Sequence, residues 1–254
     1  MEQLELDDVR QYVNQHIIDF HQRKIASLEQ LTLKKLLSKN PYLFKAKHIT
    51  TAGQLMEGLL DAFLSSSEEK LFGDFLEGLA VFIAGKTAGG HKSTAQGIDL
   101  EFIDRGVHFV VSIKSGPNWG NSSQHKKLAQ DLRSAVIRVK QARGGLRVEP
   151  VLGICYGKTR TSYTRDGYLK VVGQNFWTLI SNNQSLYTDI IEPIGYRAKE
   201  HNEAFGGGRG QVVNKFTGQF ITQFCDIDGA INWNELVKFN SGNYDLDSFL
   251  SLGE

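Results

Sequence analysis

The chain has 254 residues, of which 41% are hydrophobic and 22% charged, and its formal net charge is +1 at pH 7. This composition supports one large domain, or one domain with a small appendage, and it excludes wholesale disorder. No apolar run approaches the roughly 18 residues needed to cross a bilayer, and the polar, acidic first residues predict no secretory signal. We therefore expect a soluble, cytoplasmic protein in which Cys155 and Cys225 are both reduced.

The small net charge hides an uneven distribution. The segment from Lys114 to Lys170 contains 12 Lys and Arg against 3 Asp and Glu, a balance of +9, so the rest of the chain carries −8. A basic middle segment between acidic ends indicates a polyanion as its partner. A solvated helix face is the alternative explanation of the same charges.

The first 84 residues have a helical pattern. Apolar residues recur at helical spacing across 7–38, across 51–64 and from about 68 to 84. Asn40-Pro41 breaks the first run, and Ser65-Ser66-Ser67 predicts the start of a separate third helix. We expect a helical N-terminal region over 1–84, packed on a core over 85–254 as one compact unit.

A change of texture follows the glycine-rich connection at 85–97. Residues 98–104 and 107–114 alternate with period two around Arg105-Gly106 and predict a β-hairpin with a tight turn. The pattern then predicts an amphipathic helix over 124–142 and strands over 148–156 and 168–172. Helices are expected around 174–182, 185–201 and 210–224, with Gly206–Gly210 as a flexible connection. This order indicates an α/β core with helical additions.

Side-chain alternation in the hairpin brings reactive groups to one face. Asp99 and Glu101 share a face of the first strand, and Ser112 and Lys114 share a face of the second. The opposite faces are apolar, with Ile98, Leu100 and Phe102 on the first strand and Phe109, Val111 and Ile113 on the second. A surface salt bridge across a hairpin is one reading of this set. Phosphodiester hydrolysis is the other, since it needs carboxylates for a hard cation and a lysine for developing charge.

The same residues carry a family resemblance. Gly-Ile-Asp-Leu-Glu at 97–101, followed by Ser-Ile-Lys at 112–114, resembles the PD-(D/E)XK nuclease signature, in which an acid on one strand precedes acid-x-Lys on the next. With the loop SGPNWGNSS at 115–123, the segment GQNFWTLIS at 173–181 and the helix that carries Glu77, the chain resembles type II restriction endonucleases. The nearest likeness, from Asn40 onward, is the PmeII-type family. The resemblance implies a mixed central sheet flanked by helices, with a helical N-terminal region and helical C-terminal additions.

The resemblance also assigns roles to residues. Asp99 takes the place of the metal-binding acid and Lys114 that of the catalytic lysine, and the Ile113 carbonyl is a further ligand for Mg²⁺. Ser112 stands where the pattern has Asp or Glu, and this departure leaves one metal ligand in doubt. Glu101 beside Asp99 and Glu77 on the preceding helix are the two candidates. We favour Glu77, because a helix can aim a carboxylate at strand ends without crowding from strand neighbours.

Polar and basic residues beyond Lys114 are the candidates for DNA contact. Lysines and arginines on the 124–142 helix suit phosphates, which position without specifying sequence, and arginines of the 158–165 loop suit guanine in the major groove. A solvated helix face, and for the tryptophan a structural anchor, are the alternatives. His91 and His108 are expected to be structural. The DNA candidates are Asn118, Trp119, Asn121, Lys126, Lys127, Arg133, Lys158, Arg160, Arg165 and Arg209.

The function implied by the resemblance is that of a type II restriction endonuclease. It would hydrolyse double-stranded DNA at a short palindromic site with a magnesium-activated water, leaving 5′-phosphates, as a homodimer. A cognate methyltransferase in the host would be its functional, not physical, partner, and no membrane is involved. The alternatives are a repair or structure-selective nuclease and a catalytically inactive DNA-binding descendant, which Ser112 keeps open.

Overall fold

The computed structural model of the chain describes residues 1–242. By contacts it divides into two compact units: unit 1 is Met1–Gln22 with Glu69–Ala198, and unit 2 is Arg23–Glu68 with the chain from Lys199 onward. This division differs from the expected boundary between residues 84 and 85, and residues 243–254 of the expected core segment lie outside the described residues. Two helices, α1 (Leu6–Glu29) and α4 (Ala52–Ala88), contribute residues to both units.

Unit 1 is built on a six-stranded sheet in the order β1-β2-β3-β4-β6-β5. Neighbours β3, β4 and β6 are parallel and the other pairs are antiparallel, so the sheet is mixed as expected. The helices of unit 1 beside α1 and α4 are α5 (Ser122–Ala142), α6 (Gln174–Ser181), α7 (Leu186–Asp189) and α8 (Ile191–Ile194). The strands are β1 (His91–Lys92), β2 (Leu100–Asp104), β3 (Val107–Lys114), β4 (Arg147–Ile154), β5 (Ser162–Tyr163) and β6 (Leu169–Val172).

The predicted hairpin is the antiparallel pair β2–β3. Leu100 lies opposite Val111 and Asp104 opposite Val107. Arg105 (φ 47°) and Gly106 (φ 75°) both adopt positive φ, the conformation that a two-residue turn needs to match the twist of the strands. The Arg105-Gly106 turn is therefore confirmed.

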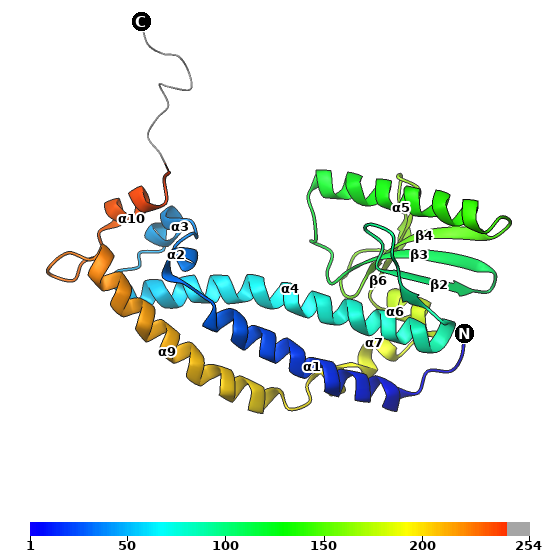
Figure 1. Cartoon of the computed structure of the whole chain (residues 1–254), viewed down its shortest axis with the longest axis horizontal. Coiled ribbons are helices and arrows are strands. Elements are labelled where there is room, and N and C mark those ends of the chain that lie inside the picture. The colour runs from blue at the N-terminus through cyan, green and yellow to red at the C-terminus, as the bar shows by residue number, and fades with distance from the viewer. Residues whose placement is uncertain (243–254) are drawn as a thin grey trace, which may run out of the picture. The chain divides into compact units, whose positions relative to one another are not determined.

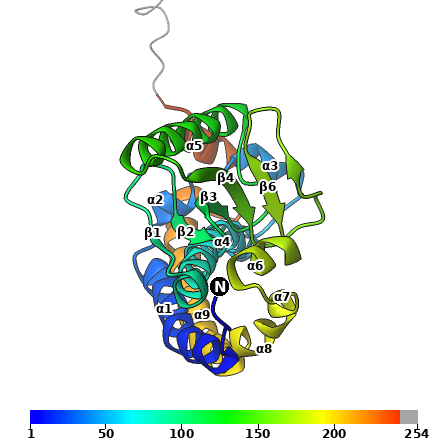
Figure 2. The same cartoon turned by 90° about the vertical axis from the view of Figure 1, so that its right-hand side faces the viewer.

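Helices cover both faces of this sheet, as Figures 1 and 2 show. On one face, α5 buries Leu128, Leu132 and Val139 against Val110 and Leu152. On the other face, the unit 1 parts of α1 and α4 pack with α6 on a second apolar cluster that includes Leu100, Val111 and Val151. The α6 segment fits closely, because a Cβ on Gly153 would lie 2.3 Å from the Phe176 ring. The sheet is thus held rigidly on both sides of the hairpin.

Unit 2 is helical in the part of the chain that the structure describes. Beside its parts of α1 and α4 it contains α2 (Leu33–Leu36), α3 (Pro41–Ala46), α9 (Ala198–Phe224) and α10 (Trp233–Phe239). The expected break at Asn40-Pro41 is the start of α3, where the Asn40 side chain accepts hydrogen bonds from the backbone N–H groups of Tyr42 and Leu43. Leucines of α1, α2 and α4 form its core with Phe216 and Phe220 of α9.

Two sequence expectations about helix ends are wrong. The serines at 65–67 do not start a helix, since α4 runs unbroken through them and Ser66 Oγ donates to the Ala62 carbonyl one turn earlier. Gly206–Gly210 is not a flexible connection but lies inside α9. Buried Phe205 and Phe216 flank these glycines, so apolar packing outweighs the weak helix propensity of glycine. No helix within residues 1–242 is both long and apolar enough to span a bilayer.

Candidate active site at the end of the hairpin

Asp99 lies immediately before β2 and is fixed by the neighbouring strand. Its Oδ2 accepts a hydrogen bond from the backbone N–H of Ile113 at 2.6 Å and another from Ser112 Oγ at 3.2 Å. Its own N–H donates to the Val111 carbonyl at 2.9 Å. The Lys114 ammonium lies 3.9 Å from the same Oδ2 and donates to the Ile113 carbonyl at 2.8 Å. Asp99, Ser112, Ile113 and Lys114 therefore meet at one end of the hairpin.

Glu77 reaches this group from α4. Burial raises the pKa of Glu77, and the negative charge of Asp99 raises it further, whereas Lys92 and Lys114 lower it. Two carboxylates that repel each other in a half-buried place are suited to share a cation. The structure thus brings Glu77 together with Asp99 and Lys114, as the sequence indicated.

Lys92 is a member of this group that sequence reasoning missed. Its ammonium lies 3.3 Å from Glu77 Oε1. It belongs to β1, a strand of two residues that pairs Lys92 with Leu100 inside what the sequence indicated as an irregular connection. So short a strand shows no alternation, and the position of a basic residue shortly before Asp99 was the only signal in the sequence.

Glu101 has other partners. Its carboxylate accepts hydrogen bonds from Ser93 Oγ, from the Arg138 guanidinium on α5 and from His108 Nε2 at 3.0 Å. Burial tends to raise the pKa of Glu101, but the bonds from Ser93, Arg138 and His108 outweigh burial and lower it. Both carboxylate oxygens are engaged in this network, which favours Glu77 as the acid that accompanies Asp99.

The expected alternation of side chains holds only within β2. Leu100 and Phe102 pack in the cluster beneath α4, but Ile98 packs in the cluster beneath α5. The prediction that Ile98 shares their face is wrong, because β2 begins at Leu100 and Gly97 before it turns the chain with φ 74°. Gly97 is required there for a second reason: a Cβ would lie 2.4 Å from Asp131 Oδ2.

Ser112, in the position of the usual acid, is buried. Its described hydrogen bond is the one that it donates to Asp99, so the hydroxyl holds the carboxylate in place rather than replacing it. Cys155 lies next to Lys114, with its N–H on the Lys114 carbonyl, and burial together with the charge of Glu77 raises the pKa of its thiol to about 12. The thiol is therefore neutral and no nucleophile. Both cysteines are free.

The oxygen atoms of this group set what it can bind. Among residues 1–242, no three His, Cys, Asp or Glu side chains are arranged to hold a metal ion. Two carboxylates, Asp99 and Glu77, and the Ile113 carbonyl remain as hard oxygen donors. Magnesium is commonly held by one or two protein carboxylates, with water and substrate phosphate completing its shell. The donor set therefore fits this cation.

The DNA candidates near the site occupy defined places. Trp119 is half-buried, 4.2 Å from the His125 ring, and its ring lies 5.7 Å from Lys114 Nζ. Asn121 caps α5 by accepting from the Gln124 N–H at 3.1 Å, which gives it a structural role beside any contact with DNA. Asn118 is exposed in the same loop.

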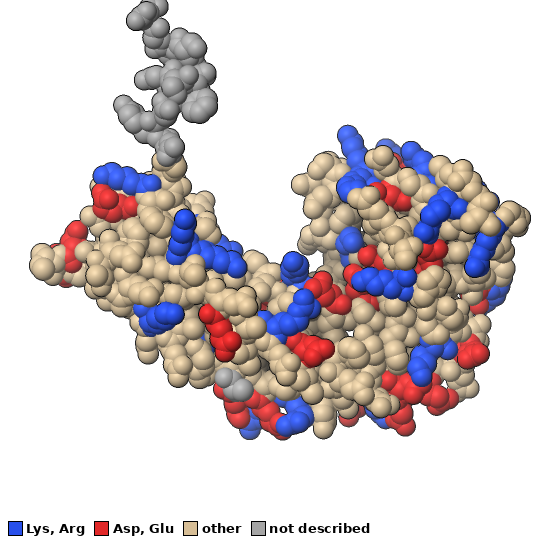
Figure 3. All heavy atoms as spheres, viewed as in Figure 1, with Lys and Arg blue, Asp and Glu red and all other residues tan. Residues whose placement is uncertain are grey.

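The basic candidates lie on exposed surface. Lys126 and Arg133 on α5 and the loop residues Lys158, Arg160 and Arg165 are exposed, with no ion pair among the described residues. Lys127 pairs with Asp131 at 3.1 Å and Arg209, in unit 2, with Asp61 at 2.7 Å. Figure 3 shows Lys and Arg side chains gathered over the part of unit 1 where Figure 1 places α5.

A mixed sheet between helices, with an acid and a lysine joined across adjacent strands, defines a restriction-endonuclease fold. The family model for type II restriction endonuclease EcoO109I matches residues 7–202 of the chain. The chain therefore belongs to the type II restriction endonuclease EcoO109I family, and its activity is site-specific cleavage of DNA. No curated protein matches the sequence in a direct comparison.

Proposed function

We propose that this enzyme hydrolyses both strands of duplex DNA at a short palindromic site, using Mg²⁺ and leaving 5′-phosphates. The observation that carries the proposal is the fixed pair at the hairpin end, where Asp99 is held by the Ile113 N–H at 2.6 Å and lies 3.9 Å from Lys114. Glu77 supplies the second carboxylate, which supports an active enzyme rather than an inactive descendant.

Asp99, Glu77 and the Ile113 carbonyl are the residues that would hold the cation. When bound there, magnesium neutralises phosphate charge and makes a bound water more acidic. Ser112 and the Ile113 N–H keep the Asp99 carboxylate in one orientation. Lys92 holds the Glu77 carboxylate from the other side.

Lys114 acts on the scissile phosphate. Its ammonium, part-buried at the strand end, can donate hydrogen bonds to the phosphate oxygen on which negative charge develops. A preorganised donor in a partly desolvated place is worth more to the transition state than the same donor in water. Loss of this donor should therefore cost far more in rate than in binding.

The wider expectations belong to the same proposal. A palindromic site and two strands to cut suit a homodimer with one active site for each strand. A methyltransferase that protects the host sequence would be its functional partner, and the cytoplasm its location. The finer likeness to the PmeII-type family is retained as part of this proposal.

Plasmid digestion tests the proposal. With Mg²⁺ we expect discrete fragments, with ends that ligate after sequencing shows their 5′-phosphates, and no cutting in excess chelator. Asp99→Asn and Lys114→Ala should abolish cutting while a gel shift shows retained DNA binding. Asp104→Asn, at the other end of β2, is the matched control and should cut normally.

Other outcomes would contradict the proposal. A smear or nicked circles without discrete fragments would indicate a repair or structure-selective nuclease. Retained binding with no cutting by the unaltered enzyme would indicate an inactive descendant. Normal cutting by Asp99→Asn would remove the site assignment itself.

A further inference from the structure

A pocket of about 440 Å³ lies at the other end of the hairpin from Asp99 and Lys114. It is bordered by the chain after α4, by β2 and β3, and by the last turn of α5, all within unit 1. None of Asp99, Ser112, Lys114 and Glu77 lines it. The pocket is therefore separate from the candidate active site, and its volume falls in the range of small-molecule sites.

One wall of the pocket is apolar. Phe102, Ile103, Val139 and Ala142 line it, and the Phe102 ring is stacked on Phe109 with the centroids 4.8 Å apart. Apolar side chains brought together around a flat aromatic ring suit the flat apolar body of a ligand.

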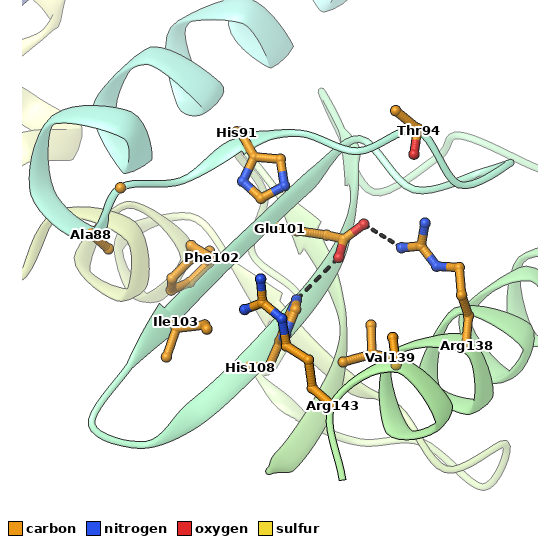
Figure 4. A pocket seen from close by; sticks show the side chains of 12 residues that line it. Ala88, His91, Thr94, Glu101, Phe102, Ile103, His108, Arg138, Val139 and Arg143 are labelled. Atoms are coloured by element: carbon orange, nitrogen blue, oxygen red, sulfur yellow. Dashed lines mark hydrogen bonds and ion pairs between the residues drawn. The ribbon is translucent and has the colours of Figure 1, made fainter.

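Two basic side chains border the pocket without partners of their own. Figure 4 shows the His91 ring and the Arg143 guanidinium extending toward the space beside Phe102 from opposite sides. Among the described residues, neither side chain has a hydrogen-bond or ion-pair partner, and both are exposed. A guanidinium has the donors that recognise a phosphate in bidentate fashion.

The acid that lines the pocket is already neutralised. Glu101 is bound by Arg138 and by His108, as the dashed lines in Figure 4 mark. It therefore does not cancel the attraction of Arg143 for an anion. The other ring nitrogen of His108, Nδ1, is buried and has no hydrogen-bond partner among the described residues, although nearly all buried polar atoms have one.

We propose that this pocket binds a nucleoside monophosphate, with its base on the Phe102 wall and its phosphate between Arg143 and His91. The apolar wall and the unpartnered cations together require a ligand with a flat body and an anionic head. Inorganic phosphate offers only the head and a nucleoside only the body, so each binds more weakly than the monophosphate.

Calorimetric titration of the full chain with adenosine 5′-monophosphate tests the proposal, with adenosine and inorganic phosphate as separate titrants. We expect the monophosphate to bind about tenfold or more tightly than either fragment. Arg143→Ala should weaken its binding by about tenfold, as expected for loss of a charge-assisted pair. Lys140→Ala removes an exposed cation from the same end of α5 outside the pocket, and should leave binding unchanged.

The titration has outcomes that overturn the proposal. Equal binding of monophosphate and inorganic phosphate would mean that the apolar wall plays no part. Absence of binding, or binding that Arg143→Ala leaves unaltered, would remove the site. Displacement of the monophosphate by duplex DNA from the Asp99→Asn variant would assign the pocket to the DNA backbone instead. Circular dichroism of Arg143→Ala separates a lost ligand contact from a lost fold.

Discussion

Ser112 illustrates how one side chain can depart from a family pattern and still serve the site. It is 1% exposed, and its hydroxyl donates to Asp99 at 3.2 Å. A neutral donor at this position stabilises the carboxylate, whereas an acid there would repel it unless a cation lay between them. The serine therefore shifts the burden of the second carboxylate to Glu77.

Replacement of this serine should reduce the rate without abolishing it. In Ser112→Ala, Asp99 keeps the Ile113 N–H but loses a hydrogen bond to a charged group, worth about 1.5–3 kcal/mol. We expect DNA cleavage to fall by about tenfold to a hundredfold, measured as the initial rate of plasmid linearisation. A rate equal to that of Asp99→Asn would show instead that the hydroxyl is indispensable.

The two acids beside Asp99 should respond differently to the same change. Glu77→Gln removes a carboxylate from the site, so we expect cleavage to be lost while the free energy of unfolding changes little. Glu101→Gln leaves Arg138 without its buried partner, and should reduce the free energy of unfolding by about 3 kcal/mol. Urea denaturation and plasmid cleavage of both variants check this. Loss of cleavage in a stable Glu101→Gln enzyme would reverse the assignment.

At the scale of elements, the helix α9 contains a glycine cluster that its packing tolerates at a cost. A Cβ on Gly207 or Gly210 would meet nothing within 4 Å, and neither residue has positive φ. Gly207→Ala and Gly210→Ala should therefore each raise the free energy of unfolding by about 0.5–1 kcal/mol, through reduced freedom of the unfolded chain.

Denaturant unfolding of each variant measures this effect. Gly97→Ala is the opposing case, because φ of 74° and the Asp131 carboxylate leave no room for a side chain; it should lower stability. Destabilisation by both α9 substitutions would show that this part of α9 is not helical in solution.

The elements also show where sequence patterns suffice. The strand at 107–114 and the helix near 124–142 were predicted nearly to the residue, because alternation and amphipathic spacing are local signals. The glycines of α9 and the serines of α4 misled, since packing of distant residues decides whether a weak helix former stays helical. In the site, Asp99 and Lys114 were found from the pattern, whereas Lys92 depended on the pairing of β1 with β2.

At the scale of the whole molecule, charge is segregated along the chain, with +9 between Lys114 and Lys170 and −8 elsewhere. The proposed contact with DNA should follow this segregation rather than the net charge. Each phosphate contact releases counterions and adds about 0.9 to the slope of log affinity against log salt concentration. Removing four contacts should therefore lower the slope by about 3 to 4.

Two matched fourfold variants in an Asp99→Asn background separate the two possibilities. Both lose four positive charges from exposed side chains: Lys126, Lys158, Arg160 and Arg165 inside the basic segment in one, and Lys34, Lys70, Lys215 and Lys238 outside it in the other. We expect the first variant to lose the slope and the second to retain it, as measured by fluorescence anisotropy of a labelled duplex across salt concentrations. Equal losses would mean that DNA responds to the net charge of the protein, and the basic segment would then no longer be the proposed binding surface.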